Sequence, residues 1–135
     1  MAGPSTMSDT RRLRMLLIDD DQNVREVLAH LLASFGFECH TAGDGVSGLG
    51  HFDKGGWDLV LLDIAMPAMS GWAVVETIRR RDPLLPIVLV TGMQEPAVMR
   101  RAREWRLPVL LKPFRFEAVQ TAVATALQPR PACGG

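Results

Sequence analysis

The sequence predicts a doubly wound α/β fold, in which five helices cover a five-stranded parallel sheet. Two observations lead to this fold class. Short runs of valine, isoleucine and leucine recur along the chain, as in parallel strands that are buried on both faces. Segments with apolar residues at helical spacing separate these runs, and each is too short to hold a further domain. The total of 135 residues is the length of one domain.

The elements of the first half follow from these patterns in order. A strand over 13–18 leads into a helix over 22–34, whose apolar residues lie at helical spacing and which ends before Gly36. A second strand is predicted over 37–41. A glycine-rich turn then opens a short helix that ends near residue 52.

The second half continues the alternation of strands and helices. Ser70 is expected to cap a helix that Pro83 follows, and Pro96 begins a later helix. The predicted strands cover 58–62, 86–90 and 107–111, and the predicted helices cover 71–81, 96–105 and 115–127. We expect residues 1–12 to be a disordered N-terminal segment and residues 128–135 to be a flexible tail.

Composition and charge exclude several classes of protein. Fifteen basic and fifteen acidic residues balance, so no overall field favours nucleic acid or an anionic membrane, and the arginines at 79–81 and 100–106 are interpreted as solvated helix ends. No apolar stretch reaches the roughly 18 residues of a membrane span. The N-terminus lacks the apolar core of a signal peptide. Cys39 and Cys133 form no disulfide framework, so we expect free thiols and a cytoplasmic location.

Four of the apolar runs end in polar residues that phosphate chemistry can use. These residues are Asp19 and Asp20 after the first strand, Asp63 after the third, Thr91 after the fourth and Lys112 after the fifth. Since ligands bind outside the carboxyl ends of parallel strands, we expect these groups to share one crevice. Carboxylates about 4 Å apart repel by roughly 4 kcal/mol at an effective dielectric constant near 20, so the cluster needs a counter-charge. Mg²⁺ and the lysine ammonium would supply it, and the set suits phosphoryl transfer to a carboxylate.

The motifs at these strand ends resemble those of the receiver domain of bacterial two-component response regulators. The matching segments are Asp19-Asp20 with Arg25 five residues on, Leu61 to Pro67 with Gly71, Val90-Thr91-Gly92, and Lys112-Pro113-Phe114. The resemblance covers residues 13–127, which we identify as the receiver domain. It implies a flavodoxin-like sheet with the strand order 2-1-3-4-5.

The resemblance also implies a role for each residue of the site. Asp63 would be the phosphoacceptor, which takes a phosphoryl group from a histidine of a sensor histidine kinase or of a histidine phosphotransfer protein. The implied Mg²⁺ ligands are Asp20, Asp63 and the backbone carbonyl of Ala65 directly, and Asp19 through water. Thr91 and Lys112 would hold the phosphoryl oxygens. Asp21 has no such role, and it is expected to cap the first helix or to be solvated.

The sequence departs from the family pattern at three positions. Receivers commonly carry tyrosine or phenylalanine three residues before the lysine, where this chain has Val109 and so has no aromatic ring to move. Trp105 is one candidate for the side chain that transmits the conformational change instead, and a role in the core is the alternative. Ala65 and Met93, two residues after Asp63 and Thr91, are apolar and cannot orient a hydrolytic water. We therefore predict slow self-dephosphorylation.

Three other interpretations fit parts of the sequence. The glycines of 43–48 match a dinucleotide-binding motif, but they follow the second predicted strand rather than the first. A phosphatase of the haloacid dehalogenase class would need an aspartate where this chain has Ala65. A third interpretation is a degenerate receiver domain that binds partners but accepts no phosphoryl group. The complete set of site residues disfavours it. We therefore expect no enzyme activity beyond the chain's own phosphorylation and slow dephosphorylation.

The resemblance implies a single-domain response regulator. Phosphorylation of Asp63 would shift the face formed by the helix 96–105, the strand 107–111 and the helix 115–127 toward a downstream protein target. The alternative is the receiver segment of a hybrid histidine kinase that acts in a phosphorelay. Neither nucleic acid nor a membrane is an expected partner, and a homodimer is left open.

Overall fold

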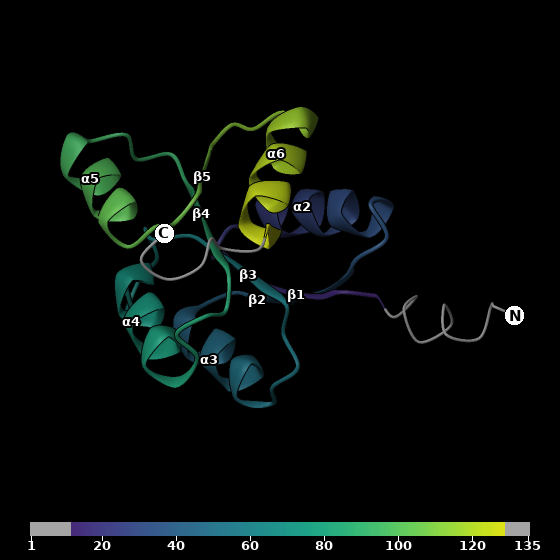
Figure 1. Ribbon diagram of the computed structural model, residues 1–135, viewed down its shortest axis with the longest axis horizontal. Coiled ribbons are helices and arrows are strands. Elements are labelled where there is room, and N and C mark those ends of the chain that lie inside the picture. Colours follow the sequence, from purple (N-terminus) through teal and green to yellow (C-terminus); the bar gives the residue numbers. More distant parts are fainter. Residues whose placement is uncertain (1–11, 129–135) are drawn as a thin grey trace, which may run out of the picture.

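The computed structural model describes residues 12–128, which form a five-stranded parallel sheet and five helices (Figure 1). The strands are β1 (Arg14–Ile18), β2 (Glu38–Ala42), β3 (Leu59–Leu62), β4 (Ile87–Thr91) and β5 (Val109–Leu111), in the spatial order β2-β1-β3-β4-β5. The helices are α2 (Gln22–Ser34), α3 (Gly45–Asp53), α4 (Gly71–Arg81), α5 (Pro96–Glu104) and α6 (Phe116–Leu127). Both the predicted fold class and the strand order are confirmed.

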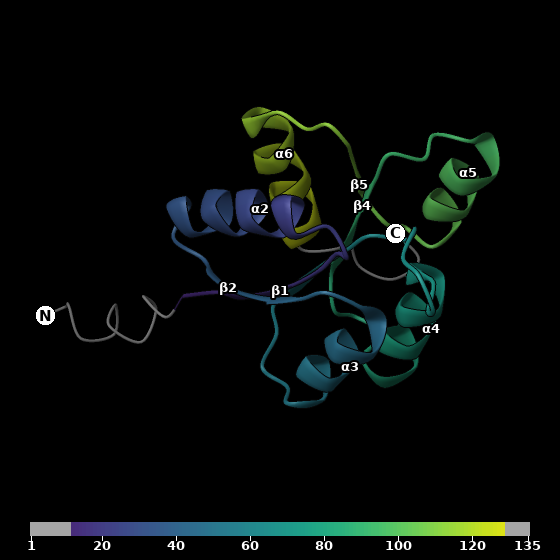
Figure 2. The ribbon, with the colours of Figure 1, turned by 180° about the vertical axis from the view of Figure 1, so that it is seen from behind.

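Helices cover both faces of the sheet. In both views α2 and α6 lie together on one side, with α3 and α4 on the other (Figures 1 and 2). Leu28 of α2 and Val119 of α6 belong to one apolar cluster, and Val74 of α4 and Ala102 of α5 belong to a second one. The residues of β1, β3 and β4 are buried almost without exception, which explains why these strands are continuous apolar runs rather than alternating patterns.

The register of the strands brings their carboxyl ends to one edge of the sheet. Ile18 pairs with Leu62, and the N–H of Asp63 donates to the carbonyl of Ile18 over 2.9 Å, so β1 and β3 end side by side. In the same way β4 and β5 end together, because the N–H of Lys112 donates to the carbonyl of Thr91 over 2.9 Å. Residues from four distant parts of the sequence therefore leave the sheet at the same edge.

Every predicted strand and helix is present, and their bounds differ from the prediction by two residues at most. The strand β5 begins at Val109 rather than at 107, because the N–H of Leu107 donates to the carbonyl of Ala102 and so closes the end of α5. Ser70 caps α4 through its hydroxyl, as predicted. Asp21 caps α2 through its carboxylate, which resolves the two alternatives left open for that residue.

Some predictions fall outside the part of the chain that the structure describes. The N-terminal segment 1–12 and the tail 128–135 lie beyond it except for one residue each, and Cys133 lies beyond it as well. Cys39 is a free, half-buried thiol in β2, and burial raises its pKa to about 11. Among residues 12–128, no helix has the length and apolar character needed to cross a membrane.

Candidate functional site

Asp63 stands directly after β3 and is almost completely buried, with 4% of its surface exposed. Its Oδ1 accepts a hydrogen bond from the N–H of Ala65 over 3.0 Å, and its Oδ2 accepts one from the ammonium of Lys112 over 3.3 Å. Burial raises the pKa of this carboxyl group; the Ala65 N–H opposes the shift, and the nearby Asp19 carboxylate adds to it. One oxygen of Asp63 is thus held by the backbone, and the other faces a charged side chain.

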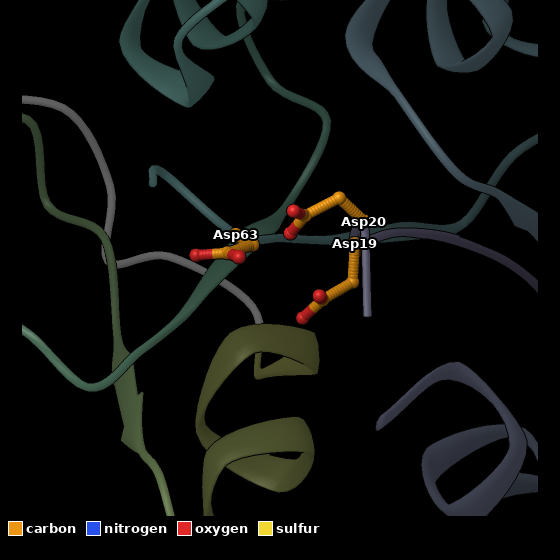
Figure 3. A group of neighbouring side chains, drawn as sticks. All are labelled: Asp19, Asp20 and Asp63. Atoms are coloured by element: carbon orange, nitrogen blue, oxygen red, sulfur yellow. The ribbon is translucent and has the colours of Figure 1, made fainter. Parts of the chain in front are cut away.

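Asp19 and Asp20 follow β1, and their carboxylates leave the chain in opposite directions (Figure 3). Asp19 is fully buried; its Oδ1 accepts the N–H of Asp21 over 2.9 Å, and its Oδ2 lies 2.9 Å from the Nζ of Lys112. Asp20 is exposed, and its carboxylate points toward the side where Asp63 lies (Figure 3). One oxygen from each of the three aspartates lies within 4.8 Å of the others.

Lys112 is the counter-charge within this cluster. Its ammonium lies 2.9 Å from Asp19 and 3.3 Å from Asp63, so it links the end of β5 to the ends of β1 and β3. Burial works to lower the pKa of Lys112, but the hydrogen bond to Asp19 and the attraction of both carboxylates outweigh it, so the pKa is raised. Lys112 therefore stays charged at neutral pH. The cluster holds one ammonium and three carboxylates, so it keeps an excess of negative charge.

Thr91 is fully buried at the end of β4, and its Oγ1 accepts the N–H of Met93 over 2.9 Å. Its carbonyl accepts the N–H of Lys112, so it lies at the same edge of the sheet as the acidic cluster. Ala65, the predicted carbonyl ligand, is exposed in the loop after β3. Direct contacts thus join Asp19, Asp63 and Lys112, whereas the strand register alone brings Thr91 to their edge.

The acidic cluster fits a divalent cation on its own geometry. Two oxygens bound to one Mg²⁺ lie about 3 to 4 Å apart, because Mg–O distances are about 2.1 Å in an octahedral shell. Carboxylate oxygens within 4.8 Å of one another therefore suit two direct ligands and a third that acts through water. The donor atoms are all oxygens, which Mg²⁺ prefers, and the cluster has uncompensated negative charge.

Arg25 and Gly71 hold the backbone of the site, a role that the sequence motifs do not reveal. The Nη1 of Arg25 donates to the carbonyl of Asp19 over 2.8 Å, which ties α2 to the end of β1. Gly71 begins α4 against the carbonyl of Asp63, and a Cβ at this position would come well inside 3.0 Å of that oxygen. The sequence signal for the role of Gly71 was its place in the first turn of a helix, where glycine is unfavourable unless close packing requires it.

The structure also describes Val109, which departs from the family pattern, and Trp105, the candidate to act in place of the missing aromatic ring. Val109 is half-buried in β5 and packs against the core. Trp105 packs against the same core cluster, and its ring lies edge-to-face with Trp72 at a centroid distance of 6.0 Å. Trp105 thus has the core role named as one alternative. Its role in transmitting a conformational change stays a prediction.

Comparisons with known proteins agree with this geometry. A family model described as the response regulator receiver domain matches residues 15–124. The chain is 34% identical over 116 residues to the regulatory protein AtoC of Escherichia coli, which covers 85% of this chain and 25% of AtoC. It is also 34% identical over 113 residues to the sensor histidine kinase RcsC of Salmonella typhi, covering 83% of this chain and 12% of RcsC. The chain thus spans far less than two thirds of these relatives.

Solved structures show the same fold over the same residues. The chemotaxis protein CheY4 of Vibrio cholerae superposes with a TM-score of 0.81 at 27% identity, covering 87% of this chain and 100% of CheY4. The response regulator TrrA of Thermotoga maritima, in complex with Mg²⁺-BeF, gives a TM-score of 0.77 at 34% identity, covering 85% of this chain and 99% of TrrA. Fold, strand-end residues and family match agree, and the chain belongs to the response regulator receiver domain family.

Proposed function

We propose that the chain is a single-domain response regulator that accepts a phosphoryl group on Asp63, with Mg²⁺, from a histidine of a sensor histidine kinase or histidine phosphotransfer protein. The observation that carries this proposal is the Lys112 ammonium, which lies 2.9 Å from Asp19 and 3.3 Å from Asp63 beside the exposed Asp20. A carboxylate next to a fixed cation suits nucleophilic attack on phosphorus. The Mg²⁺-BeF complex of TrrA, a protein 34% identical, supports Mg²⁺ as the cofactor.

In the proposed reaction an oxygen of Asp63 attacks the phosphorus of the donor's phosphohistidine. The new bond joins that oxygen to phosphorus, and the bond between phosphorus and the imidazole nitrogen breaks. The bonding electrons stay with this nitrogen, which is left in a neutral imidazole when the other ring nitrogen carries a proton. Because the Ala65 N–H holds Oδ1, we assign the attack to Oδ2, on the side of Lys112.

The surrounding groups would take up the charge of the transferred phosphoryl group. The ammonium of Lys112 would move from Asp63 Oδ2 to a phosphoryl oxygen, and the hydroxyl of Thr91 would donate to another. Bound Mg²⁺ would neutralise charge on the phosphoryl oxygens. It would be held by Asp20, Asp63 and the Ala65 carbonyl directly, and by Asp19 through water.

The proposed signal leaves the site through Thr91. Its Oγ1 accepts the N–H of Met93, so a movement of this hydroxyl toward the phosphoryl group is passed to the loop that leads into α5. The helix α5 begins at Pro96, close behind that loop. We propose the face of α5, β5 and α6 as the surface presented to a downstream protein, and a homodimer through it stays open.

The chain would turn over no separate substrate. Its own phosphorylation and the slow loss of the phosphoryl group would be its only catalysis. The cytoplasm stays the predicted location, and neither nucleic acid nor a membrane is a predicted partner.

A second candidate function is that of a receiver segment in a hybrid histidine kinase within a phosphorelay. The similarity to RcsC, a sensor histidine kinase, favours it. The reverse transfer separates the two functions, since a phosphorelay receiver exchanges its phosphoryl group with a histidine phosphotransfer protein in both directions. A stand-alone regulator is expected to take the group from its donor and to pass it to no histidine.

Replacement of Asp20 by asparagine is expected to weaken Mg²⁺ binding at least about tenfold, because the change removes a charged ligand from the site. Titration calorimetry with MgCl₂ measures this directly. Asp53→Asn is the matched control, since Asp53 is an exposed carboxylate that pairs with Arg81 instead. An Asp20→Asn protein that binds Mg²⁺ as tightly as the native one would contradict the assignment.

The phosphorylated protein is expected to lose its phosphoryl group slowly without a phosphatase. Ala65 and Met93 offer no side-chain hydrogen bond to an attacking water. In Ala65→Asn and Met93→Asn an amide could orient this water, and we expect decay about tenfold faster, below the 10²–10⁴ of a true proton acceptor. Loss of label over time measures the rate. Equal decay in the native and variant proteins would contradict the role of these two positions.

Phosphotransfer profiling tests the proposed function as a whole. Autophosphorylated candidate kinases and histidine phosphotransfer proteins are mixed with the native chain and with Asp63→Asn, with Mg²⁺ or with a chelator. We expect rapid labelling of the native chain by at least one donor, with Mg²⁺ only, and none of Asp63→Asn. Labelling of both proteins would reject Asp63 as the acceptor.

A further inference from the structure

The helices α4 and α5 border a surface hollow at a distance from the acidic cluster. Both views place α4 and α5 at the same end of the molecule (Figures 1 and 2). The hollow has a volume of about 290 Å³, and it is lined by Glu76, Arg79 and Arg80 from the second half of α4 and by Trp105 after the end of α5. These residues lie near the carboxyl ends of the two helices, whereas Asp63 lies at the carboxyl ends of the strands, the opposite edge of the sheet.

The tryptophan wall of this hollow is fixed by an arginine. The Cζ of Arg101 lies 4.4 Å from the ring centroid of Trp72 and 5.1 Å from that of Trp105, and its Nη2 lies 3.5 Å from the carboxylate of Glu76. Each such cation–ring contact is attractive even at an exposed site. The edge-to-face pair of Trp72 and Trp105 adds a further contact. The wall is therefore formed before any ligand arrives.

The charge around the hollow is unbalanced, although the chain as a whole is neutral. The lining of the hollow holds two arginines, Arg79 and Arg80, and one acidic residue, Glu76. Within residues 12–128, Arg81 pairs with Asp53 and Arg101 with Glu76, but Arg80 forms no ion pair. The guanidinium of Arg80 is exposed at the rim of the hollow and can bind a carboxylate in the bidentate mode.

We propose that this hollow binds an acidic segment of a partner protein, with one apolar side chain against Trp105 and a carboxylate on Arg80. An apolar pocket with a cationic rim is complementary to such a segment in both shape and charge. Nucleic acid is the less favoured occupant, because Arg101 already covers one face of each indole and leaves less aromatic surface for base stacking. This surface shares the α5 region with the proposed output face and adds the second half of α4. The binding requires no phosphorylation, so its failure leaves the proposed phosphotransfer untouched.

Selection from a random peptide library on the unphosphorylated native protein tests the proposal. We expect the enriched peptides to be acidic with at least one large apolar residue. Their affinity should fall at least about fivefold in Arg80→Glu, because charge reversal at the rim repels the carboxylates. Arg103→Glu is the matched control, since this α5 arginine is exposed and does not line the hollow. We expect less than a twofold change there.

The three tryptophans of the chain locate the binding site. In two-dimensional NMR spectra of the native protein, an enriched peptide should shift the indole N–H signal of Trp105 and leave that of Trp57 unchanged. Trp57 is an internal reference, because its indole donates to the carbonyl of His51 elsewhere in the fold. The proposal is overturned if no acidic peptides are enriched, if both arginine variants lose affinity equally, or if Trp57 shifts instead. Tighter binding of a mixed-sequence single-stranded DNA with the same Arg80 dependence overturns it in favour of nucleic acid.

Discussion

Replacement of Lys112 by alanine is expected to slow phosphorylation of Asp63 by about 10²–10³, the usual effect of removing one preorganised charged donor from a reacting site. The ammonium lies 3.3 Å from the oxygen to which we assign the attack, and it is held in place by Asp19 at 2.9 Å. Its raised pKa keeps it charged at neutral pH when the reaction begins. Initial rates with phosphoramidate and saturating Mg²⁺ measure the effect.

The same replacement should destabilise the fold, because it leaves two buried carboxylates without their cation. The expected loss is about 1–3 kcal/mol, below the 3–5 kcal/mol of a fully buried pair because 23% of the Lys112 side chain is exposed. Lys54→Ala is the control, since Lys54 is the other lysine of the chain and lies exposed after α3. Unchanged rates and stability in Lys112→Ala would remove the lysine from the site.

Asp63→Asn should have the opposite effect on stability, with a gain at neutral pH of about 0.5–2 kcal/mol, the usual size of a single stabilising change. The reason is that the folded state raises the pKa of Asp63, so its charged form opposes folding. As the pH falls through this raised pKa, the folded state takes up the proton first and the opposition fades. The gain is therefore expected to be largest at neutral pH and to shrink toward acid. Urea unfolding without Mg²⁺ at several pH values measures it.

Gly71→Ala is expected to destabilise the protein by about 3 kcal/mol, the upper end of over-packing effects. The added Cβ would meet the carbonyl of Asp63 and the Cα of Ile64, and backbone atoms cannot turn away as the end of a side chain can. Relief of the clash would move Asp63 itself, so phosphorylation should slow as well. Urea unfolding measures the loss of stability.

Gly50→Ala is the matched control for this substitution. Gly50 lies in the middle of α3, and a Cβ there would meet no atom within 4 Å. Alanine is the better helix former, so this variant should gain about 0.5–1 kcal/mol. If Gly71→Ala proves as harmless as Gly50→Ala, the close packing of α4 on Asp63 is not a feature of the native state.

Local patterns in the sequence were sufficient for the fold and for most of the site. The runs before Asp19, Asp63, Thr91 and Lys112 predicted buried parallel strands, and parallel topology then required their ends to meet. Ser70 and Asp21 could be named as caps because capping depends on a single side chain and the next few residues. These features need no knowledge of distant contacts.

Features that depend on tertiary packing could not be predicted in this way. The contact of Arg25 with the carbonyl of Asp19 depends on how α2 leans on β1. The stacking of Arg101 between Trp72 and Trp105 requires α4 and α5 to be neighbours at one relative height. The late start of β5 at Val109 follows from a hydrogen bond between Leu107 and the end of α5. Arg25 and Leu107 lie only six and five residues from their partners, but residue spacing alone does not determine how a helix end packs against the neighbouring strand.

Phosphoryl labelling by phosphoramidate tests the central claim most directly, because it needs no partner protein. The labelled group is counted by mass spectrometry of the intact chain and then located by peptide mapping. We expect one group per native chain, on Asp63, only with Mg²⁺, and none in Asp63→Asn. An unlabelled native protein with Mg²⁺ present, or label that persists in Asp63→Asn, would contradict a phosphoacceptor pocket at these strand ends.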